Sequence, residues 1–144
     1  MSIFPTKILL ATDGSKDAEL ALSTSVDLAD STNSELHVVT VAPGYPSYDV
    51  RRPEVVEQLR EQAEEILEDQ VKKIEQKGGK VTEKHLRIAG RHRADQIVEV
   101  AEEKEVGLIV MGSRGLGGVR RALMGSVSDS VVRHAHCPVL IVRE

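Results

Sequence analysis

The residues best suited to chemistry in this chain are glycines and serines gathered in residues 112–128. The five glycines of this segment are Gly112, Gly115, Gly117, Gly118 and Gly125. Glycine permits positive φ angles and lets the backbone approach a ligand closely. A helical pattern opens at Gly125-Ser126, so its free N–H groups and positive dipole end would face the segment. Ser126 and Ser128 add hydroxyl donors, and together these features predict an anion site suited to phosphate.

Two familiar phosphate loops do not fit this segment. Met124-Gly125 stands where the Walker A pattern requires a lysine before the serine, and Gly112-Ser113-Arg114-Gly115 lacks the spacing of a dinucleotide fingerprint. The alternative is a flexible surface loop in which Ser126 only caps the helix. Arg114 and its neighbours Arg120 and Arg121 either offset phosphate charge or are solvated surface residues.

Strands and helices alternate around this segment. Short apolar runs predict strands at residues 7–12, 35–41, 80–88, 106–111 and 138–142. Helical periodicity follows Ser15, spans residues 54–76, resumes after Gly90 and returns at residues 126–134. This order predicts an α/β fold in one domain over residues 1–144, a doubly wound, five-stranded parallel sheet with helices on both faces.

A fold of this type predicts where a ligand would bind. Ligands of open parallel sheets lie beyond the carboxyl ends of the strands, where the strand order reverses. The loops to consider follow the first, second and fourth strands. They are Asp13-Gly14-Ser15, Ala42-Pro43-Gly44 and residues 112–124.

Composition excludes several other functions. The 144 residues carry a net charge of −4 and three aromatic side chains, Phe4, Tyr45 and Tyr48, which argues against a nucleic-acid binder. The single cysteine, Cys137, excludes an internal disulfide and a structural zinc cluster, and its apolar neighbours predict a buried, inert thiol. No apolar run of about 18 residues and no signal peptide is present, so we expect a cytoplasmic protein without membrane spans.

Few side chains are placed for catalysis. Asp13 is suited either to a ribose hydroxyl or to an Asx turn, and His134 and His136 are suited to interaction with a helix dipole rather than to a metal. The remaining histidines, His37, His85 and His92, are too far apart in sequence to suggest a site. No nucleophile elbow, carboxylate pair or general base stands out, so we predict no catalytic residues.

The glycine-rich segment resembles that of the universal stress protein family, whose nucleotide-binding members carry Gly, two residues, Gly, nine residues, Gly, then Ser or Thr. Gly112, Gly115, Gly125 and Ser126 follow that spacing. The resemblance extends along the chain. It includes residues 8–15 (ILLATDGS), 37–41 (HVVTV), 110–113 (VMGS) and 137–142 (CPVLIV).

The resemblance implies an adenine nucleotide across the carboxyl edge of the sheet: ATP, ADP or AMP, with Mg²⁺ or Mn²⁺ bridging phosphate oxygens. Adenine is expected near Ala11, Thr12 and Val41, and ribose near Asp13 and Gly112. The phosphates are expected at the glycine-rich segment, and the implied residues there are Ser113, Arg114, Gly115, Gly117, Gly118, Gly125, Ser126, Val127 and Ser128.

Three functions remain open. The first is a stress-response regulatory module that binds adenine nucleotide and signals to a protein partner. The second is a slow metal-dependent ATPase, and the third is a dimeric interaction protein that does not use nucleotide. The apolar last strand, Val139–Val142, predicts a homodimer formed by pairing at a sheet edge, as is common in the family.

Overall fold

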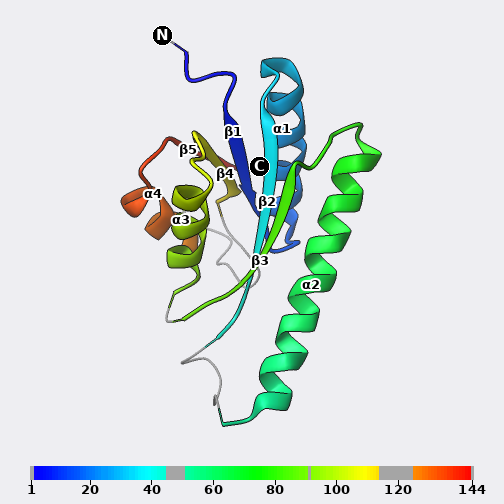
Figure 1. The fold of residues 1–144 in the computed structure, drawn as a ribbon, viewed down its shortest axis with the longest axis vertical. Coiled ribbons are helices and arrows are strands. Elements are labelled where there is room, and N and C mark those ends of the chain that lie inside the picture. Colours follow the sequence, from blue (N-terminus) through cyan, green and yellow to red (C-terminus); the bar gives the residue numbers. More distant parts are fainter. Residues whose placement is uncertain (1, 45–50, 91, 114–124, 144) are drawn as a thin grey trace.

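The strands of the chain form one parallel sheet in a computed structural model that describes residues 2–44, 51–90, 92–113 and 125–143 (Figure 1). Its strands are β1 (Lys7–Ala11), β2 (Glu35–Ala42), β3 (Glu83–Ile88), β4 (Leu108–Gly112) and β5 (Val139–Val142). They lie in the order β3-β2-β1-β4-β5, and every neighbouring pair is parallel. The predicted fold class is confirmed.

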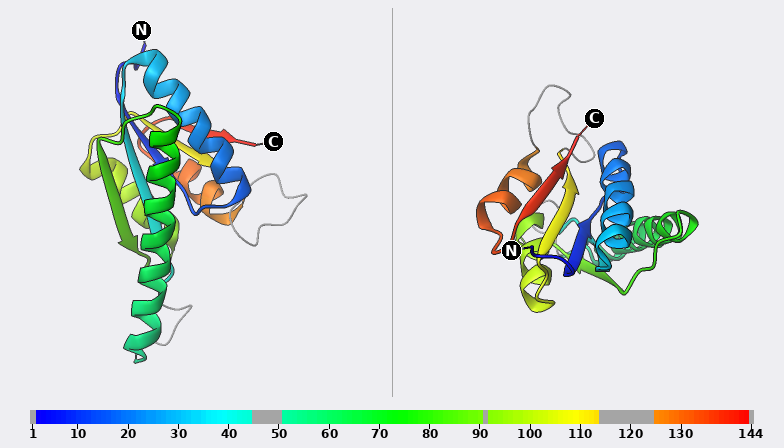
Figure 2. Two further views of the ribbon diagram at one scale, coloured as in Figure 1. Left: turned by 90° about the vertical axis from the view of Figure 1, so that its right-hand side faces the viewer. Right: turned by 90° about the horizontal axis from the view of Figure 1, so that it is seen from above.

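Helices cover both faces of this sheet. The helices are α1 (Lys16–Thr32), α2 (Pro53–Gln76), α3 (Arg93–Glu103) and α4 (Ser126–His134). Figure 2 shows α1 and α2 on one face and α3 and α4 on the other. None of the helices among the described residues is both long and apolar enough to cross a membrane.

The alternation of side chains along β1 explains why both faces are buried. Ile8 and Leu10 belong to the core beneath α1 and α2, whereas Leu9 and Ala11 belong to the core beneath α3 and α4. Ile8, Leu9 and Leu10 are fully buried. A continuous apolar run is therefore what a strand at the centre of a two-sided sheet requires.

Element boundaries differ from the predicted ones by a few residues. β3 begins at Glu83 rather than at residue 80, and the turn that precedes it passes through Gly78, whose φ is +85°. β4 begins at Leu108 rather than at residue 106, because Val106 N–H still donates to Ala101 C=O at the end of α3. Residues 45–50, which include Tyr45 and Tyr48, lie outside the described residues.

Candidate functional site

The strand order places the candidate site at a switch point. β1 lies between β2 and β4, and the connection that leaves β1 runs to β2 whereas the one that leaves β4 runs the opposite way along the sheet, to β5. Ala11, the last residue of β1, pairs with Val39 of β2 and with Met111 of β4. Thr12, Val41 and Gly112 therefore lie near one another at the carboxyl edge, where ligands of such sheets bind.

The turn after β1 is fixed by side-chain hydrogen bonds. Thr12 Oγ1 donates to Gln70 Oε1 of α2 at 2.7 Å and accepts the Gly14 N–H at 3.2 Å. Asp13 Oδ1 accepts the Ser15 N–H at 3.0 Å, which is the Asx turn considered as an alternative role for Asp13. Gly14 has a φ of +78°, a conformation that favours glycine.

The start of α1 follows directly from this turn. Ser15 caps the helix, because its Oγ accepts the Ala18 N–H at 3.3 Å. Asp17 in the first turn is buried, and Ser113 Oγ donates to its carboxylate at 2.9 Å. This hydrogen bond joins the start of α1 to the residue that follows β4.

The end of β4 packs tightly against the same turn of α1. A Cβ at Gly112 would lie 2.8 Å from the carbonyl carbon and 2.9 Å from the Cβ of Asp17. No side chain fits there unless the backbone moves. Gly112 therefore has a packing role in addition to any contact with a ligand.

The start of α4 is held to the end of β4. The Gly125 N–H donates to the Ser113 carbonyl, and Ser128 Oγ donates to the same carbonyl at 2.8 Å and to the Gly125 carbonyl at 3.1 Å. The buried Ser128 hydroxyl is thus engaged within the fold rather than free to donate to phosphate. At this position the group suited to an anion is the backbone amide, because the first-turn amides of α4 have no acceptor within the helix.

The side of the edge expected to receive adenine is apolar. Ala11 and Met111 are buried in the core beneath α3 and α4, and Val41 packs against that core while remaining partly exposed. Apolar side chains at this position suit the face of a flat base.

The structure thus brings together the predicted residues that it describes: Ala11, Thr12, Asp13, Val41, Gly112, Ser113, Gly125, Ser126, Val127 and Ser128. Arg114, Gly115, Gly117 and Gly118 lie outside the described residues, as do Arg120 and Arg121. Two supporting residues, Asp17 and Gln70, were not predicted. Their only sequence signal is a polar residue in an amphipathic helix, and such residues are usually exposed.

Two expectations about single residues need correction. Cys137 is partly rather than fully buried, although desolvation still raises the pKa of its thiol. His136, for which only an interaction with a helix dipole was expected, pairs with the carboxylate of Glu102 of α3. Both residues are placed by contacts between distant elements, which local sequence does not specify.

A third expectation, that the remaining histidines are unrelated, is wrong for two of them. The rings of His37 and His85 lie parallel, with centroids 5.8 Å apart. The register of β2 with β3 brings them together, since His85 lies opposite Val39 and is thus displaced by two residues from His37. A pairing register is not visible in either strand alone.

These features define the class of protein. It is an open, doubly wound α/β domain whose switch point presents backbone amides and polar side chains. The chain belongs to the universal stress protein family, whose family model matches residues 5–143. It is 36% identical over 146 residues to universal stress protein MJ0531 of Methanocaldococcus jannaschii, covering 96% of this chain and 82% of that protein.

Solved structures agree with this assignment. The structure of hypothetical protein MJ0577 aligns with a TM-score of 0.83 and 30% identity, covering 99% of this chain and 98% of that one. A universal stress protein from Archaeoglobus fulgidus in complex with dAMP aligns with a TM-score of 0.70 and 26% identity, covering 99% of this chain and all of that one. A relative of this fold therefore binds an adenine nucleotide.

Proposed function

We propose that this chain binds an adenine nucleotide, ATP in particular, at the carboxyl edge of β1, β2 and β4. The proposal rests on the way Ser113 joins α1, β4 and α4. Its hydroxyl donates to Asp17 at the start of α1. Its carbonyl accepts from the Gly125 N–H and the Ser128 hydroxyl at the start of α4. The start of a helix held in this way presents fixed amides to an anion. The dAMP complex of the Archaeoglobus relative supports adenine as the base.

The proposed roles follow the chemistry at each position. Adenine lies against Ala11, Thr12 and Val41, and ribose approaches Asp13 and Gly112. Phosphates meet the amides at the start of α4 and the glycine-rich segment, whose proposed ligand-binding residues are Arg114, Gly115, Gly117, Gly118, Gly125, Ser126, Val127 and, through its backbone amide, Ser128. Ser113 positions this site, because its N–H, carbonyl and hydroxyl are engaged within the fold.

Mg²⁺ or Mn²⁺ accompanies the triphosphate in this proposal. Such ions take oxygen ligands, commonly one or two carboxylates with phosphate oxygens. Asp13 provides a carboxylate at the carboxyl edge, so the donor set there fits a hard cation. A bound ion would neutralise phosphate charge, and Asp13 would be the carboxylate nearest to it, while the amides at the start of α4 would hold phosphate oxygens.

We assign the protein a regulatory role in the cytoplasm, in which nucleotide occupancy of one domain over residues 1–144 signals to a protein partner during stress. A fixed phosphate site binds without turnover unless a group orients the attacking water. Slow hydrolysis is the alternative outcome of the test below.

The test begins with protein purified without added nucleotide, denatured and assayed for ATP, ADP and AMP by chromatography. The protein is then titrated with each nucleotide and Mg²⁺ by calorimetry. Gly115→Asp should abolish binding while the far-UV circular dichroism spectrum stays unchanged, because it adds a carboxylate where phosphate should lie. Ser31→Ala, on the exposed side of α1, is the control. Normal ATP affinity in Gly115→Asp would refute the site, and phosphate release lost in Ser126→Ala would favour hydrolysis.

A homodimer through β5 is the second part of the proposal. β5 ends the strand order, and Leu140 within it is 36% exposed. An apolar edge strand with unpaired backbone groups is suited to pair with a second copy. Leu140→Lys should convert a dimer into a monomer in sedimentation velocity, and a wild-type chain that sediments as a monomer would rule the dimer out.

A further inference from the structure

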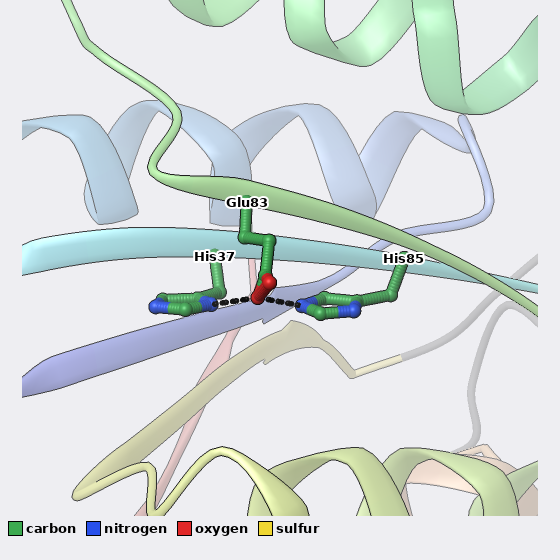
Figure 3. Close-up of side chains that lie close together, drawn as sticks. All are labelled: His37, Glu83 and His85. Atoms are coloured by element: carbon green, nitrogen blue, oxygen red, sulfur yellow. Dashed lines mark ion pairs between the residues drawn. The ribbon is translucent and has the colours of Figure 1, made fainter.

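A cluster of possible metal ligands lies on β2 and β3, at the side of the sheet away from β4 and β5. His37 of β2 pairs directly with Glu83, the first residue of β3, and His85 follows two residues later on the same face. One ligand atom from each of these three residues lies within 4.8 Å of the others. Figure 3 shows the Glu83 carboxylate between the two imidazoles, with one nitrogen of each ring directed toward it.

The distances are close to those of a coordinated ion. Glu83 Oε2 lies 3.9 Å from His37 Nδ1 and 3.6 Å from His85 Nε2. Ligands at the usual zinc bond lengths of about 2.0–2.1 Å are about 3.4 Å apart in a tetrahedron. The two carboxylate–imidazole distances therefore need to close by about 0.5 Å and 0.2 Å around an ion, and the two imidazole nitrogens, which lie within 4.8 Å of each other, by up to about 1.4 Å.

The nitrogens are buried and lack other partners. The His37 side chain is 5% exposed and that of His85 is 8% exposed. Within the described part of the chain, neither nitrogen of His37 nor Nε2 of His85 makes a hydrogen bond. A buried polar atom without a partner is costly, and a bound cation would supply the missing interaction.

The protonation states also suit a cation. Burial lowers the pKa of both His37 and His85, which keeps the imidazoles neutral with a lone pair available. The hydrogen bond from Lys104 lowers the pKa of Glu83, so this residue is a carboxylate at neutral pH. Glu35 Oε1 lies 3.8 Å from His37 Nε2, the ring nitrogen that faces away from the cluster. A carboxylate beside the distal nitrogen is the usual outer partner of a metal-bound histidine.

We propose that His37, Glu83 and His85 bind one divalent transition-metal ion of the zinc class. Two imidazoles and one carboxylate are ligands that zinc accepts, whereas Mg²⁺ and Ca²⁺ require oxygen. The sequence has a single cysteine, which excludes a zinc site built from several thiolates. The proposed ligands include no thiolate, so that exclusion does not apply to this site. The ion joins the edge strand β3 to β2, and solvent reaches it past Glu83, whose side chain is 45% exposed.

Lys104 lies beside the proposed metal site and allows a test in which metal affinity should rise rather than fall. Its Nζ lies 3.2 Å from Glu83 Oε2 and 3.3 Å from Oε1, so the ammonium competes with a metal for the same carboxylate. Removing this charge should strengthen metal binding several-fold, because a like charge near the ion is lost. A gain of affinity cannot arise from misfolding.

The experiment is calorimetric titration of nucleotide-free protein with Zn²⁺, with Co²⁺ as a spectroscopic probe of coordination geometry. We expect one Zn²⁺ per chain and tetrahedral Co²⁺ absorption bands. Affinity should fall by more than about 100-fold in His85→Gln and Glu83→Gln, beyond the 10–100-fold effect of losing an outer partner. Lys104→Gln should bind more tightly, and His136→Gln, which removes an exposed histidine beside Glu102, should bind as the wild type does.

Three results would overturn the proposal. They are no stoichiometric Zn²⁺ binding, unchanged affinity in His85→Gln and Glu83→Gln, or loss of the ion in His136→Gln. A fall in affinity on Lys104→Gln would contradict the assigned ligand Glu83. Because the titration uses the metal alone, its outcome does not depend on whether the chain binds nucleotide at the switch point between β1 and β4.

Discussion

Gly112→Ala tests whether the contact between β4 and α1 is as tight as the structure indicates. The added Cβ would lie 2.8 Å, 2.9 Å and 3.0 Å from the carbonyl carbon, Cβ and carbonyl oxygen of Asp17. Carbon atoms in favourable contact are about 3.5–4.0 Å apart, so the strand and the helix must separate by nearly 1 Å. Two of the three atoms are backbone, and no rotamer change relieves the overlap.

The size of the effect follows from two opposing contributions. Overpacking typically costs about 1–3 kcal/mol. Replacing glycine reduces the freedom of the unfolded chain and returns about 0.4–1 kcal/mol. The net loss is therefore about 1–2 kcal/mol, which lowers the melting temperature by about 3–7 °C in a domain of this size.

The assay is thermal unfolding followed by circular dichroism, with Gly90→Ala as the matched control. Among the described residues, no atom beyond the chain neighbours of Gly90 lies within 4 Å of a Cβ built there, so this substitution should leave stability unchanged or slightly raised. Nucleotide affinity should fall in Gly112→Ala, since the residue lies between the start of α1 and the candidate site. Equal melting temperatures for both variants would refute the packing argument.

Three further substitutions or treatments test neighbouring contacts. Ser113→Ala should cost about 1.5–3 kcal/mol in urea unfolding, because it removes a donor to the buried Asp17 carboxylate; an effect below about 0.5 kcal/mol would contradict this role. Thr12→Val should cost about 1–3 kcal/mol by leaving buried Gln70 Oε1 without its donor, whereas Thr24→Val on the exposed side of α1 should be near neutral in the same assay. Cys137 should react with iodoacetamide at pH 8 more slowly in the folded than in the unfolded protein, because a raised pKa leaves less thiolate at any given pH; equal rates would exclude that shift.

The fold was predictable because its signals are local. The apolar run of β1 and the Ser15 cap of α1 each specify an element within a few residues. When strands and helices alternate in this way, the rules of chain connection allow only a few sheet topologies. The loops at the candidate site follow from the topology, and Asp13 was placed correctly at the carboxyl edge.

The contacts that support the candidate site were not predictable, because they join residues that are far apart in the sequence. The hydrogen bond from Ser113 to Asp17 spans 96 residues of sequence, and that from Thr12 to Gln70 spans 58. His37 and Glu83 meet only because β2 and β3 pair in one register, and a shift of one residue would direct their side chains to opposite faces. Such contacts depend on how distant elements dock.

The hydrogen bond from Gly125 to the Ser113 carbonyl has a consequence for how this site can diversify. The bond closes the chain at the two ends of residues 114–124, so the framework on either side does not depend on what connects them. Doubling the length of a flexible connection costs only about 0.6 kcal/mol in closure entropy. If residues 114–124 contact the nucleotide as proposed, we therefore expect insertions or replacements there to change which ligand is preferred while the scaffold remains folded. On that proposal, ligand preference and fold stability can vary independently among proteins related to this chain.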